Sequence, residues 1–341
     1  MRVMLSALTL TVALLVAPAA RAGEAGKPVP FILDFVVYGK HAPHYVSLDQ
    51  GFFREEGLAV EILRGQGSGE AVKNVALGKA EFGHADTGTL ILARTKGQKA
   101  RVVGMIHHKN LLGVFFLKKT GIRTPKDLEG KVFGGPLASA AWTMFPAFAR
   151  AAGINPNVEY KAMDAAARIP SFVAGRIQAT TDFMTSLPGY LKGAEQRGEE
   201  VGYFLYADYG LDFYNNGFIA HDDTVARNPD LVRRFARASY RGIAWSVENP
   251  ERAVDVFMRH VPQADRGTAR LQFKIMVDHL YDGLSEKQGL GVVDEAKMRR
   301  TIQEVNEAFK IREKIEPKDV YTNDFVKDLP KAWLFPKRVK F

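Results

Sequence analysis

The stretch FILDFVVYGKHAPHYVSLDQGFFREEGLAVEIL, residues 31–63, decides the fold. Its first eight residues are almost wholly apolar, which is typical of a buried strand. Residues 43–53 have the pattern of a short helix, and 58–63 form a second apolar run of strand length. Two strands joined by a helix make a βαβ unit, so the stretch predicts a mostly parallel sheet.

The same alternation continues along the chain and then restarts. Further strands are expected at 80–85, 100–106, 132–135, 158–161, 177–183, 201–206 and 218–221, with helices between most of them and a helical tail from 229 onward. We predict an α/β protein of two lobes. The first lobe is discontinuous, 28–120 plus 213–341, and the second is 121–212, with crossings near 113–120 and 207–216. Ligands of such sheets bind in the cleft at the strand ends.

The first 22 residues have the features of a secretory signal peptide. Met1-Arg2 is positive, 3–18 is apolar without a charge, and Ala20-Arg21-Ala22 offers a cleavage site. A membrane anchor is the alternative, but the apolar run falls short of the roughly 20 residues that span a bilayer. We therefore expect residues 1–22 to be removed and the mature protein to lie in a bacterial periplasm.

Composition excludes several classes of function. The 341 residues include no cysteine, so a disulfide, a thiolate metal site, a cysteine nucleophile and a lipid-modified cysteine are all excluded. The net charge is +9, and removing Arg2 and Arg21 with the signal peptide leaves +7. The excess is spread out, with no basic stripe interleaved with aromatics, so no nucleic-acid partner is expected.

The segment that follows the first predicted strand carries the first candidate site. Tyr38 and His41 lie at a strand's carboxyl end, where a ligand of this architecture binds. His41 and His44 have the spacing of an HxxH pair, but a metal site needs more ligands, and no HExxH motif is present. We predict no metal, a ligand contact by Tyr38 or His41, and a scaffold role for His44.

A glycine-rich turn, RGQGSGE at 64–70, follows the second strand and opens a helix. Its glycines allow a close backbone approach, which makes Gln66 and Ser68 candidates for ligand binding. A tight turn with Ser68 as the N-cap is an equally good interpretation. The turn lacks both the dinucleotide fingerprint and the phosphate-binding P-loop pattern, so we expect no cofactor.

The remaining candidates also stand at strand ends. They are Asp86, Ser139, Tyr214 and Asn215. The main role expected for Asp86 is to cap the helix that follows it. Ser139 is either an N-cap or a hydrogen-bond donor to the ligand. With no nucleophile elbow and no evident carboxylate pair, we predict no catalytic residue and no enzyme. Mixed amides, hydroxyls and aromatics suit the binding of a planar polar molecule.

Several segments resemble the ABC-importer periplasmic solute-binding proteins of the superfamily that binds aliphatic sulfonates, nitrate and thiamine-pyrimidine precursors. They are YGKHAPHYVSLDQGFFREEGLAVEIL (38–63), GSGEAVKNVALGKAEFGHADTGTLI (67–91), GIRTPKDLEGKVFGGP (121–136), AGRIQATTDF (174–183) and NNGFIAHDDTVARNPDLVRRFARA (215–238). The resemblance implies a type II periplasmic-binding-protein fold whose lobes close on a small molecule. It also implies a membrane permease as partner. We expect a monomer.

The resemblance leaves the ligand open. In the pyrimidine-precursor binders a histidine after the first strand and cleft aromatics contact the ring, and His41 and Tyr38 fall at comparable positions. The D-W-x-P-N run of those proteins is here DFVVY at 34–38, which puts a pyrimidine ligand in doubt. A sulfonate or other organic anion is the alternative, with Arg64 and Arg168 as the nearest arginines. Yeast-type pyrimidine synthases use iron and a cysteine-rich motif, which this chain lacks, and a ligand sensor for a receptor kinase would share the fold.

Overall fold

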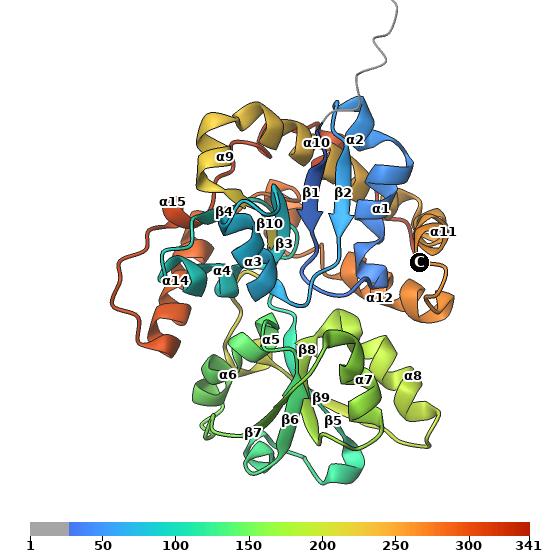
Figure 1. Cartoon of the computed structure of the whole chain (residues 1–341), viewed down its shortest axis with the longest axis vertical. Helices are drawn as coiled ribbons and strands as arrows, with labels where there is room; N and C mark the ends of the chain where they lie inside the picture. The colour runs from blue at the N-terminus through green and yellow to red at the C-terminus, as the bar shows by residue number, and fades with distance from the viewer. Residues whose placement is uncertain (1–26) are drawn as a thin grey trace, which may run out of the picture.

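The computed structural model describes residues 27–341 and forms two lobes, each built on a five-stranded sheet (Figure 1). The signal peptide expected at 1–22 lies outside the described residues. We call the part built on the first sheet the first lobe and the part built on the second sheet the second lobe. Among the described residues, no helix combines the length and apolar character needed to cross a membrane.

Each sheet contains one strand that runs against its other four. The first sheet has the order β2-β1-β3-β10-β4, and the second has the order β7-β6-β8-β5-β9. The first is made of β1 Val29–Ile32, β2 Val60–Leu63, β3 Phe82–Asp86, β4 Ala100–Met105 and β10 Asn216–His221. The second is made of β5 Leu112–Leu117, β6 Val132–Gly135, β7 Glu159–Ala162, β8 Ala179–Phe183 and β9 Val201–Leu205.

The reversed strands are β10 and β5, and the path of the chain explains both. β10 pairs antiparallel with β3 and β4, and β5 pairs antiparallel with β8 and β9. Each is the strand by which the chain enters a sheet from the other lobe, so it starts at the cleft where the other four strands end. The mostly parallel sheet expected from sequence is therefore a mixed sheet in both lobes.

Two boundaries differ from the sequence expectation. Residues 113–120, which we expected to form the first crossing and to belong to the first lobe, lie mostly in β5, a buried strand of the second sheet. The chain therefore leaves the first sheet before residue 112. Strand β1 ends at Ile32 although the apolar run continues to Tyr38. The backbone bends at 34–36, and Asp34 there finds charged partners that an extended strand would not reach.

The helices of the first lobe cover its sheet and flank the cleft. They are η1 Gly39–His41, α1 Ala42–Asp49, α2 Phe52–Glu55, α3 Ser68–Ala76, α4 Thr87–Arg94, α9 Asp222–Arg227, α10 Pro229–Glu248, α11 Pro250–His260, α12 Arg266–Asp278, α13 Ser285–Gln288, α14 Glu295–Phe309, α15 Pro317–Val320 and α16 Lys331–Leu334. The longest, α10, begins with Pro229 after Asn228, whose side chain accepts from the Leu231 amide. Its Phe235 ring stacks on Phe82 at 3.8 Å between centroids.

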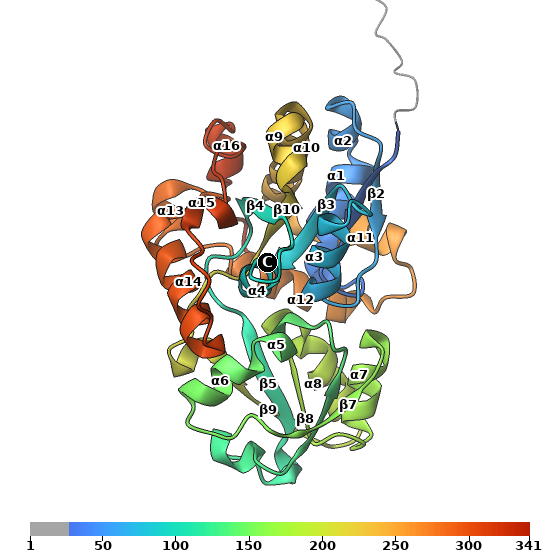
Figure 2. The same ribbon diagram turned by 60° about the vertical axis from the view of Figure 1, so that its left-hand side comes forward.

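The second lobe is smaller. Its helices are η2 Lys118–Thr120, η3 Pro125–Leu128, α5 Ala140–Thr143, α6 Phe145–Ala151, α7 Ala165–Val173, η4 Met184–Ser186, α8 Leu187–Glu195 and η5 Tyr206–Tyr209. Helix α12 of the first lobe packs on α8 and η4, and α14 packs on α6 (Figure 2). Two helices of the tail therefore bracket the cleft, and the lobes touch at both sides of it.

Candidate functional site

The two lobes are in direct contact across the cleft. The Gly69 amide donates to the carbonyl oxygen of Ala138 at 3.0 Å. The side chain of Gln66 makes two further bonds: its Nε2 donates to Asp164 Oδ2 at 2.8 Å, and its Oε1 accepts from the Ala165 amide at 3.2 Å. The glycine-rich turn of the first lobe thus meets two strand-to-helix turns of the second lobe, and the conformation is closed.

Two cations lie over aromatic rings of the opposite lobe. Lys40 Nζ, from the first lobe, lies 4.5 Å from the centroid of the Phe183 ring. The Arg168 guanidinium, from the second lobe, lies 4.5 Å from the centroid of the Phe35 ring. Cation–π contacts are worth roughly 0.5–2 kcal/mol, with desolvated ones at the upper end. Because both pairs need the lobes together, they favour the closed state.

A buried carboxylate, Asp34, organises the floor of the cleft. It accepts from Lys40 Nζ at 2.6 Å, from His41 Nε2 at 2.8 Å and from Asn216 Nδ2 at 2.8 Å. Burial alone would raise the pKa of Asp34, but the charge of Lys40, the proximity of His84 and the bond from His41 hold it well below its usual value. Asp34 is therefore ionised and fully paired.

The second cation, Arg168, is also neutralised. It is fully buried, pairs with Asp182 and donates from Nη1 to the Thr181 carbonyl at 3.1 Å. The Tyr190 hydroxyl donates to the same carboxylate at 3.0 Å. Arg64, the other arginine considered for an anion, pairs with Asp164 at 3.3 Å. Lys40, Arg168 and Arg64 therefore each have a carboxylate partner.

Asp34, His41 and His84 are close enough to be considered as metal ligands. One ligand atom from each lies within 4.8 Å of the others. The set offers only three ligands, whereas structural zinc takes four. The Lys40 ammonium also occupies one oxygen of Asp34, and a divalent cation would lie beside it. The donor set therefore fits a hydrogen-bonded cluster better than a metal centre.

Several histidines near this cluster are buried and neutral. Burial lowers the pKa of His84 and of His107 to about 3, and it lowers the pKa of His44 well below its usual value. His44 Nε2 and His84 Nδ1 lie 3.2 Å apart, and the His44 ring packs edge-on against Phe31. His44 therefore has the environment of the scaffold residue expected from sequence.

Unpartnered buried polar atoms recur next to the strands. Of the eleven buried side-chain nitrogen and oxygen atoms that lack a hydrogen-bond partner within residues 27–341, five belong to residues that follow or begin a strand, namely His107 Nδ1, His108 Nε2, Thr185 Oγ1, Asn215 Oδ1 and Asn216 Oδ1. Two more are His84 Nε2, within β3, and Arg168 Nε, within α7. Buried polar groups are paired in most proteins, so these atoms mark places that a polar ligand can complete.

Three of the predicted site residues lie together in the first lobe. Ser68 is not the N-cap of α3, because Gly67 holds that position and the Ser68 hydroxyl instead accepts from the Asp86 amide at 3.1 Å. Asp86 caps α4 as expected, accepting from the Thr89 amide at 2.7 Å. Asn215 Nδ2 donates to Asp86 at 3.3 Å. Burial raises the pKa of Asp86 to about 7.

Three other predicted residues are buried, and two of them have their polar atoms bonded within the protein. Both ring nitrogens of His41 are used, since Nδ1 accepts from the Tyr38 amide at 3.1 Å and Nε2 donates to Asp34. The Tyr214 hydroxyl accepts from the Asp294 amide at 2.8 Å, which ties it to α14. Ser139 occupies the N-cap position of α5 without a side-chain bond. Their roles as ligand contacts stay predictions.

Tyr38 lines a cavity of about 250 Å³ that both lobes share. Ile169 and Gly189 contribute from the second lobe, and Gln272 contributes from α12. Burial raises the pKa of Tyr38 to about 12 although Arg168 lies beside it. The phenol is therefore neutral. Its hydroxyl can both donate a hydrogen bond to an uncharged ligand and accept one from it.

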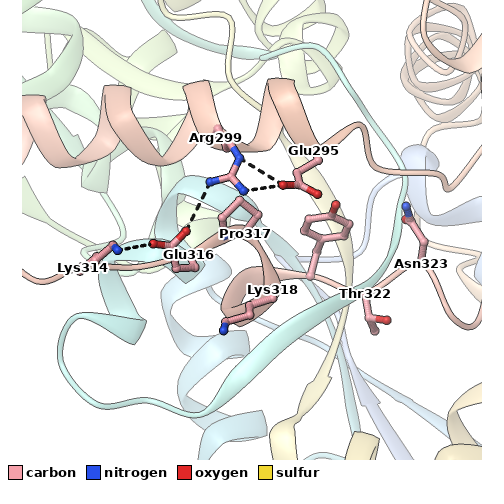
Figure 3. Close-up of a pocket in the computed structure, with 9 residues that line it drawn as sticks. Glu295, Arg299, Lys314, Glu316, Pro317, Lys318, Thr322 and Asn323 are labelled. Atoms are coloured by element: carbon pink, nitrogen blue, oxygen red, sulfur yellow. Dashed lines mark hydrogen bonds and ion pairs between the residues drawn. The ribbon is translucent and has the colours of Figure 1, made fainter.

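A larger cavity lies away from this cluster. It has a volume of about 660 Å³, and α14, α15 and the residues around them line it (Figure 3). Four of its five charged side chains pair with one another: Arg299 bonds Glu295 and Glu316, and Lys314 also bonds Glu316. With these charges paired, the cavity resembles an ordinary surface groove of the first lobe.

The residues predicted from sequence to contact a ligand did not include Asp34, Lys40, Asn216 or His107. The available signal was a lone aspartate inside an apolar run, because a charge at the end of a buried strand needs partners. Lys40 and His41 follow it by six and seven residues, within reach after one bend. Asn216 is 182 residues away, so only the fold brings it there.

Comparison with known proteins identifies a family and several relatives. The family model described as NMT1/THI5 like matches residues 39–253. The riboflavin-binding protein RibY of Chloroflexus aurantiacus is 23% identical over 91% of this chain and 89% of its own length. The formylaminopyrimidine-binding protein of Halalkalibacterium halodurans is 27% identical over 71% and 73%. A 4-amino-5-hydroxymethyl-2-methylpyrimidine phosphate synthase of Legionella pneumophila is 28% identical over 69% and 74%.

Solved structures show the same fold. The alkanesulfonate-binding protein SsuA of Xanthomonas axonopodis superposes with a TM-score of 0.67 at 10% identity, covering 86% of this chain and 98% of that one. The periplasmic nitrate-binding protein NrtA of Synechocystis gives 0.60 at 15% identity, covering 90% of both. The chain therefore has the type II periplasmic-binding-protein fold that its two lobes indicated.

Proposed function

The chain belongs to the NMT1/THI5-like family, and from that premise we propose that it is the solute-binding component of an ABC importer. In this proposal it captures a small nitrogen-bearing heteroaromatic molecule between its lobes and delivers it to a membrane permease. The protein acts as a periplasmic monomer after removal of residues 1–22. Riboflavin and formylaminopyrimidine, the ligands named for two relatives, define the ligand class.

One observation favours an uncharged aromatic ring as the ligand. Lys40 and Arg168, the buried cations of the cleft, are each paired with a carboxylate and each lie on a phenylalanine ring. A sulfonate or nitrate would need an unpaired cation or a set of donors to replace its hydration. The cleft offers aromatic faces and uncharged acceptors instead, which suit an uncharged ring.

Closure supplies the mechanism of capture. A ligand shifts a two-state equilibrium only by its differential affinity for the two states, so it must touch both lobes when they are closed. The unpartnered atoms of His84, Asn215 and Asn216 are in the first lobe, and Thr185 and Arg168 are in the second. A ring placed between them completes its contacts only after closure.

An enzyme of the pyrimidine-synthase type is the other candidate, because relatives of that name align with the chain. The sequence has no cysteine to supply the cysteine-rich motif of the yeast-type enzymes. The nearest metal-ligand set, Asp34 with His41 and His84, has Lys40 bound in it. These observations favour binding without turnover.

A thermal-shift screen tests the proposal. The purified protein is unfolded, dialysed free of bound molecules, refolded and screened against riboflavin, aminopyrimidines, nucleobases, sulfonates, nitrate and divalent metals. A ligand at 100 times its Kd stabilises by about 2.7 kcal/mol, which raises the Tm by a few degrees. A shift with a heteroaromatic ring supports the proposal. A shift with sulfonates or nitrate alone overturns the neutral-ring assignment, and a shift with iron accompanied by turnover overturns the binding role.

A further inference from the structure

A groove lies where α3 and α4 of the first lobe meet α5 of the second lobe (Figure 1). It has a volume of about 520 Å³. Lys73, Lys96 and Gln98 line it from the first lobe, and Leu137 and Thr143 line it from the second. A smaller cavity of about 280 Å³ shares its three first-lobe residues and continues it along that lobe. We call the two together the α3–α4 groove.

The α3–α4 groove carries an excess of positive charge. Lys73, Lys96 and Lys99 line it, all three are exposed, and none of them takes part in an ion pair within residues 27–341. Among the described residues that line it, Glu70 is the only carboxylate, and that side chain accepts from the Gln66 amide at 2.6 Å. Unpaired lysines along a concave surface attract an anionic partner.

The carboxylate next to the groove is already paired. His221 lines the groove, and Asp222 follows it in the chain. Asp222 accepts from Arg101 Nε at 2.8 Å and lies 3.1 Å from Arg94 Nη1. Two arginines therefore hold this carboxylate, and the charge of the lysines is available to another molecule.

Exposed leucines stand at this groove on both lobes. Leu77, from the end of α3, is 59% exposed, and Leu137, from the second lobe, is 65% exposed. These are the two largest exposed fractions among the large apolar side chains of the described residues. Apolar side chains surrounded by polar and charged groups mark a protein interaction site. A flat layer of anionic lipid headgroups would match the lysines but would not fill a concave groove, so the surface favours an acidic protein segment.

Only the closed conformation assembles the whole groove. Its second-lobe wall contains Ala138, whose carbonyl oxygen accepts from the Gly69 amide of the first lobe at 3.0 Å. Separation of the lobes breaks this bond and moves Leu137 and Thr143 away from Lys73. A partner that contacts both walls therefore binds the closed form more tightly than the open form.

We propose that the α3–α4 groove docks an acidic segment of the membrane permease. Lys73 and Lys96 pair with the carboxylates of that segment, and Leu77 and Leu137 cover its apolar side chains. The inference rests on the proposed function and adds to it the face of the molecule and the charge that the permease meets. None of these four side chains is a predicted ligand contact, so changes at the groove should affect delivery without affecting capture.

The test separates uptake of a ligand from its binding. Cells of the source organism carry the double variant Lys73→Glu with Lys96→Glu as their sole copy of the protein, and they are supplied with labelled riboflavin or a labelled aminopyrimidine. We expect uptake to fall at least about tenfold, while the Kd of the purified variant stays within about twofold of the wild-type value. The matched control is Lys287→Glu with Lys331→Glu, because both lysines are exposed and neither lines the groove. It should leave uptake unchanged.

A leucine variant tests the wall that the second lobe contributes. Leu137→Gln should lower uptake and leave the Kd unchanged. Leu191→Gln is the control in the same lobe, since Leu191 is 47% exposed on α8 and does not line the groove. It should change neither quantity.

The outcomes separate the inference from the function on which it rests. Wild-type uptake in the groove variants would show that the inference is wrong, and the proposed function would stand. A Kd that rises in proportion to the loss of uptake would assign the groove to ligand binding and overturn the docking role. Sedimentation with phosphatidylglycerol vesicles of the wild-type protein, but not of the double lysine variant, would overturn a protein segment as the occupant. If neither ring binds to the wild-type protein or enters the cells, the proposed function fails and the inference fails with it.

Discussion

Gly67 lies so close to the backbone of Ala138 that a Cβ built on Gly67 would be 2.1 Å from the Ala138 carbonyl oxygen. Gly67 belongs to the first lobe and Ala138 to the second, so the contact exists only when the lobes are closed. A side chain at position 67 would collide with rigid backbone and not with a flexible side-chain end. Closure of the lobes therefore requires a residue without a Cβ at position 67. The stability of either lobe by itself does not depend on this contact.

The first prediction concerns Gly67→Ala. The added methyl group should hold the lobes apart, so ligand binding should weaken by at least about tenfold, or 1.4 kcal/mol. The Tm of the ligand-free protein should change little, because the open form tolerates the methyl group. Calorimetric titration and a thermal scan of the same sample measure both.

Two other glycines serve as controls for that variant. Gly283 has no atom within 4 Å of a built Cβ, so Gly283→Ala should leave binding unchanged. Gly39 would collide with Ala269 at 2.0 Å inside the first lobe, so Gly39→Ala should lower the Tm instead. A Gly67→Ala variant with wild-type affinity would show that this contact does not limit closure.

The second prediction concerns the cation–π contact between Lys40 and Phe183. Phe183→Leu keeps an apolar side chain but removes the ring, so closure should lose about 0.5–2 kcal/mol and Kd should rise about 2- to 30-fold. Phe148→Leu is the matched control, because Phe148 is buried in the second lobe, where it stacks on Tyr206 at 4.8 Å. It should lower the Tm without a comparable change in Kd. If Phe183→Leu and Phe148→Leu raised the Kd equally, the contact between Lys40 and Phe183 would not favour closure.

The third prediction concerns the buried pair of Asp34 and Lys40. Asp34→Asn leaves the Lys40 ammonium, 3% exposed, without its carboxylate, so the free energy of unfolding should fall by about 3–5 kcal/mol. Lys40→Met in the same background should restore much of the loss, which denaturant titration of the four proteins would measure. The exposed pair of Lys118 and Glu200 is the control: Glu200→Gln should leave the free energy of unfolding almost unchanged, because solvent screens that pair. Strict additivity of the two Asp34 and Lys40 changes would rule out their coupling.

The fourth prediction concerns pH. His84 and His107 have pKa values lowered from 6.5 to about 3, so their contribution to stability is complete above pH 6.5 and is lost as the pH falls toward 3. Asp86 has a pKa raised from 3.8 to about 7, so its contribution is complete below pH 3.8 and is lost as the pH rises through 7. The pKa of His44 is also lowered, so the combined contribution of the histidines to stability exceeds that of Asp86. The Tm should therefore fall on acidification from pH 6.5 to pH 4.

The variant Asp86→Asn removes the contribution of Asp86 to the pH dependence of stability, which opposes that of the histidines. It can still cap α4, but it no longer titrates, so the Tm should fall more steeply on acidification between pH 7 and pH 4 than in the wild-type protein. Asp208→Asn, at an exposed position, is the control and should leave the slope unchanged. A slope for Asp86→Asn equal to that of the wild-type protein would mean that Asp86 does not titrate in this range.

The alternation of strands and helices was enough to predict two α/β lobes with a cleft at their strand ends. It did not predict the antiparallel direction of β10 and β5, because strand direction depends on where the chain re-enters a sheet. Asp86 was correctly expected to cap a helix, since capping is local. The Ser68 hydroxyl bonds Asp86, 18 residues away, and no local rule indicates that choice.

The candidate site was predictable only in outline. Its segments follow strands, and each was visible as a polar cluster after an apolar run. The network around Asp34 was not, because the bend at 34–36 replaces an expected strand and Asn216 arrives from 182 residues away. The pairing of Arg168 with Asp182 likewise depends on how α7 packs on β8. Periodicity carries no information about which charges neutralise each other.

The binding of a neutral ring is tested most directly by calorimetric titration of the purified, ligand-free protein with an aminopyrimidine, riboflavin, an alkanesulfonate and nitrate. We predict binding of a neutral heteroaromatic ring with a Kd in the micromolar range or below, and no binding of either anion, because Lys40 and Arg168 already have carboxylate partners. Tight binding of the sulfonate or of nitrate, with no heat from the rings, would contradict it.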